Sequence, residues 1–169
     1  MRIFKEEQRF NQTWIIVLLV LSAIIPSVII TNRYLENSES LSTAEFIGTL
    51  SIVVIATGLI FFFKLSTRID EKGIYYKFFP FQFKPKLIEW QEINKAYVRN
   101  YDAITEYGGW GLKGGALWNK SKGRAINVSG DIGIQLQLKN GKKLLIGTQK
   151  KEEAIRVLEA YKIKLNTDV

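Results

Sequence analysis

Residues 14–30, WIIVLLVLSAIIPSVII, decide the class of fold, because these 17 consecutive residues carry no charge. At a rise of about 1.5 Å per residue, such a helix is roughly 25 Å long, which is just enough to cross a thin bilayer core. A second uncharged block of 18 residues follows at 46–63, FIGTLSIVVIATGLIFFF. Backbone groups in lipid must form their hydrogen bonds within their own segment, so both blocks are predicted to be transmembrane helices.

Two alternatives to a pair of membrane spans are disfavoured. Core helices of a soluble protein would need amphipathic partners to cover them, and the chain offers too few. A cleaved signal peptide is disfavoured because Glu6 and Glu7 precede the first block and no small-x-small cleavage pattern follows Ile30. We therefore expect a retained helical hairpin. Neither block contains a charged residue, which argues against a transporter, ion pathway or proton relay.

The distribution of Lys and Arg around the two blocks predicts their orientation. The loop between them holds one basic residue, Arg33, and three acidic ones, whereas both outer flanks are basic. The flanking basic residues are Arg2, Lys5, Arg9, Lys64, Arg68, Lys72 and Lys77. Positive residues favour the cytoplasmic side, so we predict a multi-pass protein of the inner (cytoplasmic) membrane with both termini in the cytoplasm.

These observations divide the chain into five parts. We predict a cytoplasmic tail at residues 1–13, a first span at 14–31, an external loop at 32–43, a second span at 44–65 and a cytoplasmic domain at 66–169. From residue 64 onward the chain has 20 basic and 11 acidic residues, although the net charge of the whole chain is only +8. The cytoplasmic domain is therefore strongly basic.

The composition also limits the chemistry available to the protein. The chain has no cysteine, which excludes disulfides, thiolate metal sites and Cys nucleophiles. It has no histidine, which removes the commonest general base and the Ser-His-Asp triad. We expect no catalysis, no metal and no cofactor. Adjacent carboxylates such as Asp70-Glu71 diverge along a strand or helix and are expected to be solvated charges.

The pattern after the second block mostly has a period of two, which is typical of β-strands. Predicted strands cover residues 74–79, 81–84, 95–101, 124–129, 132–138 and 142–147. Pro80 separates the first two strands, because proline cannot donate to a strand ladder. Asn140-Gly141 predicts a hairpin with a type I′ turn, because both residue types tolerate positive φ.

The last segment changes its period. Ala154, Leu158, Tyr161 and Leu165 recur at helical spacing, with Thr148 as the predicted N-cap. The predicted fold class is therefore α+β: a transmembrane helical hairpin followed by an antiparallel β-barrel or split sheet of six to seven strands, capped by a C-terminal helix.

Four features of this domain resemble the bacterial pleckstrin-homology-like (PH-like) domains of small membrane proteins. They are the aromatic strand after Gly73, the Ile88-Glu89-Trp90-x-x-Ile93 segment, the Asn140-Gly141 hairpin and the closing helix. The resemblance covers roughly residues 66–165, and a helix pair often accompanies this domain in the family. It implies a scaffold for protein or lipid contact without a shared catalytic set. No ligand-binding residue is carried over from the family.

Residues 107–118, YGGWGLKGGALW, differ from the rest of the domain. The segment has five glycines, two tryptophans and one tyrosine, and basic residues lie in it and follow it. Glycine permits close backbone approach and positive φ. The candidate partner- or lipid-contact residues are Tyr107, Trp110, Lys113, Trp118, Lys120, Lys122 and Arg124.

Three interpretations of this segment stay open. Its tryptophans fold back into the mouth of the barrel, or form a protein-docking loop, or contact the lipid interface. Gly109, Gly111 and Gly114 also match a dinucleotide-binding G-x-G-x-x-G pattern. That motif requires a strand before it and a helix after it, whereas strands are predicted on both sides here.

The sequence thus predicts a membrane-anchored interaction module that presents a PH-like domain at the cytoplasmic membrane face. Expected partners are the bilayer and either a protein or an anionic lipid headgroup. Nucleic acid is not expected, and an oligomer is compatible with the sequence. One alternative is a membrane enzyme acting on lipid or peptide, because Lys, Ser, Tyr and carboxylates remain available. Another is an accessory subunit whose helix hairpin binds a membrane partner.

Overall fold

The computed structural model describes residues 2–36, 42–114 and 123–165. The chain forms two compact units. The helical unit is Phe10–Phe63, and the sheet unit combines Met1–Arg9 with Lys64–Val169. The sheet unit is therefore discontinuous in sequence, because the whole helical unit is inserted after its first strand.

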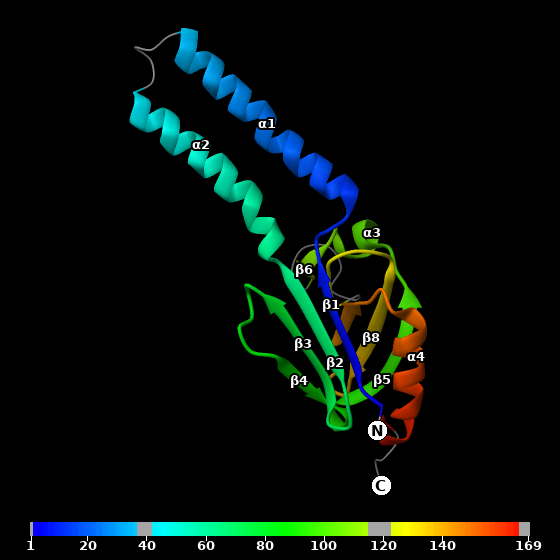
Figure 1. Ribbon diagram of the computed structural model, residues 1–169. Helices are drawn as coiled ribbons and strands as arrows, with labels where there is room; N and C mark the ends of the chain where they lie inside the picture. Colours follow the sequence, from blue (N-terminus) through cyan, green and yellow to red (C-terminus); the bar gives the residue numbers. More distant parts are fainter. Residues whose placement is uncertain (1, 37–41, 115–122, 166–169) are drawn as a thin grey trace. The chain divides into compact units, whose positions relative to one another are not determined.

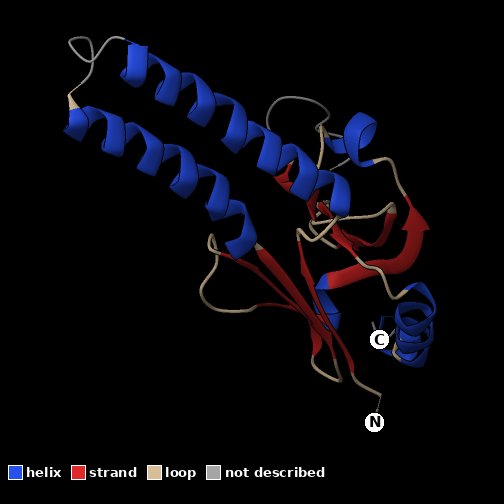
Figure 2. Ribbon diagram, turned by 45° about the horizontal axis from the view of Figure 1, so that its top comes forward, coloured by secondary structure: helices blue, strands red, loops and turns tan. Residues whose placement is uncertain are grey.

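The helical unit is a hairpin of two long helices, which run side by side in Figure 2. They are α1 (Thr13–Glu36) and α2 (Thr43–Gly58), and α2 continues into the 3₁₀ helix η1 (Leu59–Phe62). A capping box begins α2: the Ser42 hydroxyl accepts from the Glu45 amide, and the Glu45 carboxylate accepts from the Ser42 amide. At the same end, Tyr34 of α1 stacks on Phe46 with ring centroids 4.4 Å apart.

Both helices are long and apolar enough to cross a membrane, judged by length and composition. Their apolar side chains are largely exposed: Ile52 and Val54 of α2, for example, are 68% and 63% exposed. Pro26 lies inside α1, which continues beyond it to Glu36. The prediction of two long apolar helices at the start of the chain is confirmed.

The sheet unit contains nine strands in the described residues, together with short helices. The strands are β1 (Phe4–Arg9), β2 (Lys64–Ile69), β3 (Gly73–Phe79), β4 (Lys86–Glu89), β5 (Ile93–Asn100), β6 (Gly111–Lys113), β7 (Arg124–Asn127), β8 (Ile132–Leu138) and β9 (Lys143–Gly147). The helices are the 3₁₀ helix η2 (Trp90–Glu92), α3 (Ala103–Tyr107), α4 (Lys151–Ala160) and α5 (Lys162–Leu165).

These strands form two sheets. The first has the order β1-β2-β3-β4 and is antiparallel throughout, as Figure 1 shows for these neighbouring strands. The second has the order β5-β8-β9-β7-β6, in which β7 and β9 are parallel. Over the described residues the two sheets do not close into a barrel. Helix α4 packs against β1, β5 and β8.

The core lies between the inner faces of the two sheets and under α4. In the first sheet, β3 has the alternation expected of a strand with one buried face, and Ile74 and Phe78 are fully buried. In the second, Ile134 and Leu136 of β8 and Ile146 of β9 are fully buried. Helix α4 covers the core with Ala154, Val157 and Leu158, which confirms the predicted amphipathic closing helix.

Buried polar side chains of strand β1 form hydrogen bonds to residues 147–149, far away in the sequence. The Glu6 carboxylate accepts from the Thr148 hydroxyl at 2.6 Å and from the Gln149 amide at 2.8 Å. The Gln8 side-chain amide donates to the Gly147 carbonyl at 2.7 Å. Because Glu6 and Gln8 are only 7% and 4% exposed, these bonds are sheltered from water.

Several sequence-based predictions are corrected. The strand number of six to seven is too low: β1 lies in the predicted tail, and β2 begins within the predicted second span and continues into the domain, where no strand was predicted before residue 74. The all-antiparallel prediction is wrong at β7 and β9. The predicted strand at residues 81–84 is instead part of a turn, in which the Gln82 side chain accepts from the Phe78 amide and the Gln82 amide donates to the Phe78 carbonyl.

Two local predictions at the C-terminal end of the domain also change. The Asn140-Gly141 hairpin is present, but only Gly141 has positive φ, so the turn is not type I′. The Gly141 amide donates to the Leu138 carbonyl, as in a type I turn followed by a bulged glycine. The N-cap of α4 is Lys150 rather than Thr148. The Thr148 hydroxyl accepts from the Lys150 amide and donates to Glu6.

Replacing Glu6 tests the attachment of β1. Glu6→Ala leaves the Thr148 hydroxyl and the Gln149 amide without their acceptor, so the free energy of unfolding is expected to fall by about 1–3 kcal/mol. The measurement is thermal or denaturant unfolding of the purified full chain. The matched control is Glu7→Ala: Glu7 is its neighbour, but its side chain is 63% exposed and pairs with Lys64 at 2.7 Å. Exposed pairs contribute about 0–1 kcal/mol. Equal losses for the two variants would contradict the buried role of Glu6.

Candidate functional site

Helix α3 and the strands beside it hold the described part of the glycine- and tryptophan-rich segment. The Asp102 carboxylate caps α3 by accepting from the amides of Ile104 and Thr105, each at 2.8 Å. These bonds lower the pKa of Asp102. Gly108 ends α3 with a φ of 74°, a conformation that suits glycine. The local sequence thus explains why a short helix stands before the first glycines.

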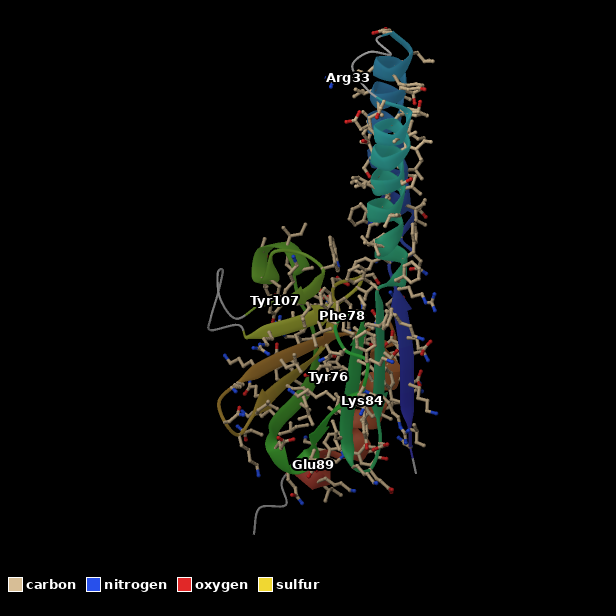
Figure 3. The ribbon with its side chains drawn as sticks, turned by 90° about the vertical axis from the view of Figure 1, so that its left-hand side faces the viewer. Arg33, Tyr76, Phe78, Lys84, Glu89 and Tyr107 are labelled. Carbon is tan, nitrogen blue, oxygen red and sulfur yellow. The ribbon has the colours of Figure 1, made fainter. Side chains whose placement is uncertain are left out.

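Tyr107 is part of a buried cluster and is only 3% exposed. The cluster contains Tyr101, Ala103, Tyr107, Ala125 and Leu145, and Trp110 packs against it. The rings of Tyr101 and Tyr107 meet edge to face with centroids 6.0 Å apart. Tyr107, labelled in Figure 3, is therefore a core residue in this structure and offers no surface for a partner.

Arg99 of β5 clamps α3 to the second sheet. Its guanidinium donates to both carboxylate oxygens of Glu106, at 2.8 and 3.0 Å, and to the Tyr107 hydroxyl at 3.1 Å. Its Nε donates to the Gln135 side chain at 3.1 Å. The bond to Glu106 raises the pKa of Arg99, and burial opposes this rise. Because the charge of Arg99 is matched by Glu106, this network has a structural role and leaves little capacity for a ligand.

Tyr101 has a similarly internal role. Its hydroxyl accepts from the Asn127 side-chain amide at 2.9 Å, and the Asn127 carbonyl oxygen accepts from the Gly111 amide at 2.9 Å. Burial raises the pKa of Tyr101 to about 12, against a smaller lowering by Asn127. Burial also raises the pKa of Tyr107. Both phenols therefore stay neutral near pH 7, where they support the packing around residues 107–111 and do not exchange protons.

The other predicted contact residues differ in burial and in position. Trp110 is half-buried, and its indole nitrogen donates to the Gly130 carbonyl at 3.4 Å. Lys113 is half-buried on β6, and Arg124 is exposed at the start of β7. Trp118, Lys120 and Lys122 lie outside the described residues. The structure thus brings Trp110 and Tyr107 together on one cluster and leaves Arg124 on a different surface.

Gly114 of the segment and Gly123, which follows it, are required by close backbone contacts. A Cβ on Gly114 would lie 2.4 Å from the Gly123 carbonyl oxygen, and one on Gly123 would lie 2.3 Å from the Lys143 carbonyl oxygen. Both have positive φ, at 96° and 81°. Strand β6, and not a helix, occupies residues 111–113 within the G-x-G-x-x-G match. Gly114 and Gly123 therefore serve close strand packing, and within the described residues the motif contains a strand where a dinucleotide site would begin its helix.

Arg124 belongs to a cleft between the two sheets, which sequence analysis did not identify. The cleft has a volume of about 510 Å³ and runs between β4 and the starts of β7 and β9. Its basic lining residues are Lys86, Arg124, Lys142 and Lys143, and its floor includes Tyr76 and Ile88, which are buried. Glu92 is the acidic residue of this lining. A site with four cations and an apolar floor fits a ligand that carries an acidic group beside an apolar part.

The basic residues of the cleft come from separate parts of the sequence, which explains why they were missed. Pairing of Arg124 with Leu144 places the start of β7 beside the start of β9, and Lys142 and Lys143 follow the Asn140-Gly141 turn. The described part of the chain has no group of three acidic side chains that could hold a metal ion. No protein-family model matches the sequence, and a search of curated proteins finds no match either.

A double-mutant cycle on Arg99 and Glu106 tests the clamp on α3. The two side chains are 24% and 16% exposed, so the coupling free energy between Arg99→Ala and Glu106→Ala is expected to be about 1–2 kcal/mol. The same cycle on Lys150 and Glu153, whose side chains are 47% and 41% exposed, is the control. That pair is expected to couple by about 0.5 kcal/mol or less. A weaker coupling for Arg99 and Glu106 than for the control would contradict the assigned role.

The pKa of Tyr101 predicts the behaviour of the domain in alkali. Its pKa in the folded chain, about 12, exceeds the ordinary tyrosine value of 10.0, so the unfolded chain releases this proton first as the pH rises. The contribution to stability is therefore complete below about pH 10 and is lost between about pH 10 and pH 12. Ultraviolet titration of phenolate is expected to lose its last step in Tyr101→Phe. An unchanged last step would contradict the assignment.

Proposed function

We propose that this chain is a non-enzymatic binding module with a PH-like domain, anchored in the inner membrane by two helices and exposed to the cytoplasm. The observation that carries the proposal is the position of the helical unit in the sequence. It is inserted between β1 and β2, two neighbouring strands of one sheet.

The pairing of β1 with β2 supports two membrane crossings. Arg9, the last residue of β1, is paired with Lys64, the first residue of β2. Three residues connect Arg9 to α1, and Phe63 alone connects η1 to Lys64. The chain thus leaves the sheet and returns to it at one strand end. If α1 crosses a bilayer, α2 must cross it back.

The exposed apolar surface of the helices supports the bilayer as their environment. Among the residues that the structure describes, Ile15 is the one buried residue of α1, and α2 has none; large side chains such as Val54 of α2 and Phe62 of η1 are 63% and 64% exposed. Apolar surface in water costs about 25 cal/mol per Å², so two such helices would be strongly unfavourable in water. Hydrocarbon removes this cost, and the uncharged composition of both helices suits it.

The charge distribution supports the cytoplasmic side for the sheet unit. Basic residues gather on the flanks that join this unit, whereas the loop between the helices is acidic. The two sheets with a closing helix support the PH-like assignment, although β1 is an addition to the predicted strands and the predicted strands β7 and β9 pair in parallel. The lack of His and Cys in the sequence supports a binding role over catalysis.

The cleft between the sheets supports an acidic partner for the module. Lys86, Arg124 and Lys142 surround an opening whose floor is partly apolar. A carboxylate or phosphate group gains charge-assisted hydrogen bonds from such side chains. Because the domain is tethered at the membrane, a weak attraction for an acidic peptide or an anionic headgroup acts at high effective concentration.

Single cysteines test the anchoring and the orientation, because the chain has no cysteine of its own. Glu36→Cys lies at the end of α1, and Gln91→Cys lies in η2 of the sheet unit; both positions are exposed. The cells are first freed of their cell wall and of any outer membrane. A membrane-impermeant maleimide is then expected to label the cysteine at position 36 directly, and the cysteine at position 91 only after the inner membrane is permeabilised.

Two outcomes would contradict this proposal. Labelling of position 91 in intact cells would reverse the orientation. Recovery of the full chain in the soluble fraction after detergent-free lysis would remove the membrane anchor. Thermal unfolding of both cysteine variants controls for an intact fold, because neither side chain is buried.

A further inference from the structure

The turn between β3 and β4 exposes two phenylalanines at one edge of the sheet unit. Phe81 is 62% exposed and Phe83 is 74% exposed. Both belong to the run FFPFQFKPK at residues 78–86, which also carries Lys84 and Lys86. Two large aromatic side chains in one short exposed turn call for a partner that covers them.

Hydrogen bonds and ring contacts hold the turn against the end of β3. The Gln82 amide donates to the Phe78 carbonyl at 2.8 Å, and the Gln82 side-chain oxygen accepts from the Phe78 amide at 3.0 Å. Phe81 stacks on Phe78 with centroids 5.9 Å apart, and Phe83 meets Phe79 edge to face at 5.7 Å. The turn is thus fixed against the end of β3, which lowers the entropy that binding would cost.

Strand register locates this turn relative to the helical connection. Phe79 is paired with Lys64, the residue that directly follows the helical unit. Lys86, at the start of β4, is paired with Tyr76, three residues back along β3. At about 3.4 Å per residue, the two residues that flank the turn, Phe79 and Lys86, are paired within roughly 10 Å along β3 of the strand end that follows η1. Figure 3 labels Phe78 towards this end of the sheet unit and Glu89 towards the other.

We propose that Phe81 and Phe83 insert into the interface of the same bilayer that holds the helices. The inference rests on the proposed membrane anchoring, because the short connection at Phe63 then keeps the strand end close to the lipid. Phe is among the apolar side chains that interfacial segments bury at the boundary between headgroups and acyl chains. Lys84 and Lys86 follow the phenylalanines and suit anionic headgroup phosphates.

This contact would give the module a third attachment besides its two helical connections. The helical unit is joined to the sheet unit through two short connections, residues 10–12 and residue 63. An inserted turn on the β4 side of the sheet fixes one face of the unit towards the lipid. The cleft between the sheets, whose lining includes Lys86, then has a defined orientation to the membrane surface.

Spin labels on single cysteines measure this insertion directly. Phe83→Cys, Val54→Cys and Ile163→Cys are made separately in the full chain and reconstituted into nanodiscs of phosphatidylcholine and phosphatidylglycerol. Oxygen, which concentrates in lipid, and a water-soluble nickel complex are compared as relaxation agents. The oxygen-to-nickel ratio at position 83 is expected to lie several-fold above that at 163 and below that at 54.

Ile163 is the matched control, because it is an apolar residue that is 80% exposed at the other end of the unit. Its neighbour Tyr161 stacks on Trp90, and Lys164 donates to the Glu71 carbonyl in the β2–β3 turn. That turn is about 17 Å along β2 from Lys64. Unfolding of each labelled variant verifies the fold, since all three replaced side chains are exposed.

Each other outcome has a definite meaning. An aqueous ratio at 83 with a lipid ratio at 54 overturns the inserted turn and leaves the anchoring intact. An aqueous ratio at 54 overturns the proposed anchoring itself. Protection of position 83 from both agents overturns lipid insertion in favour of a protein or a second copy on the turn.

Discussion

The buried hydrogen bonds of Glu6 and Gln8 hold the architecture together. They attach β1 to the chain at residues 147–149, while the backbone of β1 pairs with β2. The Tyr161 hydroxyl adds a bond to the Arg2 carbonyl at 2.6 Å. The residues before the helices are thereby made part of the sheet unit. Without these bonds, the first strand would be an ordinary chain end, and the helical unit would be held at one connection only.

Fixing both ends of the helical hairpin to neighbouring strands limits what the protein can do. An odd number of crossings is incompatible with the pairing of Arg9 and Lys64. The strand end at Lys64 and Phe79 is also kept near the base of the hairpin by chain length alone. Under the proposed anchoring, a binding surface on this unit would work beside a membrane, where two-dimensional confinement strengthens weak contacts. The exposed phenylalanine turn and the basic cleft both lie on the β4 side of the first sheet.

The helices, the central strands and the closing helix could be predicted from the sequence, because their apolar residues follow clear periods. Ile74 to Phe79 and Ile132 to Leu138 alternate, and Ala154 and Leu158 share a helix face. Strand β1 escapes prediction because its inward positions after Phe4 hold Glu6 and Gln8, so no apolar alternation is visible. Strand β2 escapes because it begins at Lys64, directly after the apolar run of the second helix that ends at Phe63. Both strands form because they are hydrogen-bonded to residues far away in the chain, and such partners cannot be identified from the local sequence.

Prediction of the candidate site from the sequence was limited in the same way, because its contacts join residues far apart in the chain. Sequence composition identified an unusual segment and glycines in close backbone contact, which Gly114 and Gly123 illustrate. It did not reveal that Tyr107 is buried under Arg99, because the ion pair with Glu106 joins β5 to α3. The sequence also did not predict that Lys86 and Arg124 line one cleft, because they are 38 residues apart in the chain. Burial and charge matching, and not residue type, separate structural residues from surface residues here.

Amide hydrogen exchange across β1 tests the central claim most directly. In the full chain in a bilayer mimic, the amides of residues 4–9 that pair with β2 are expected to exchange as slowly as those of residues 64–69. Glu6→Ala is expected to speed exchange in both strands together. Immediate exchange of residues 4–9 beside a protected β2 would show a free N-terminal tail and would contradict the two-point attachment of the helical hairpin.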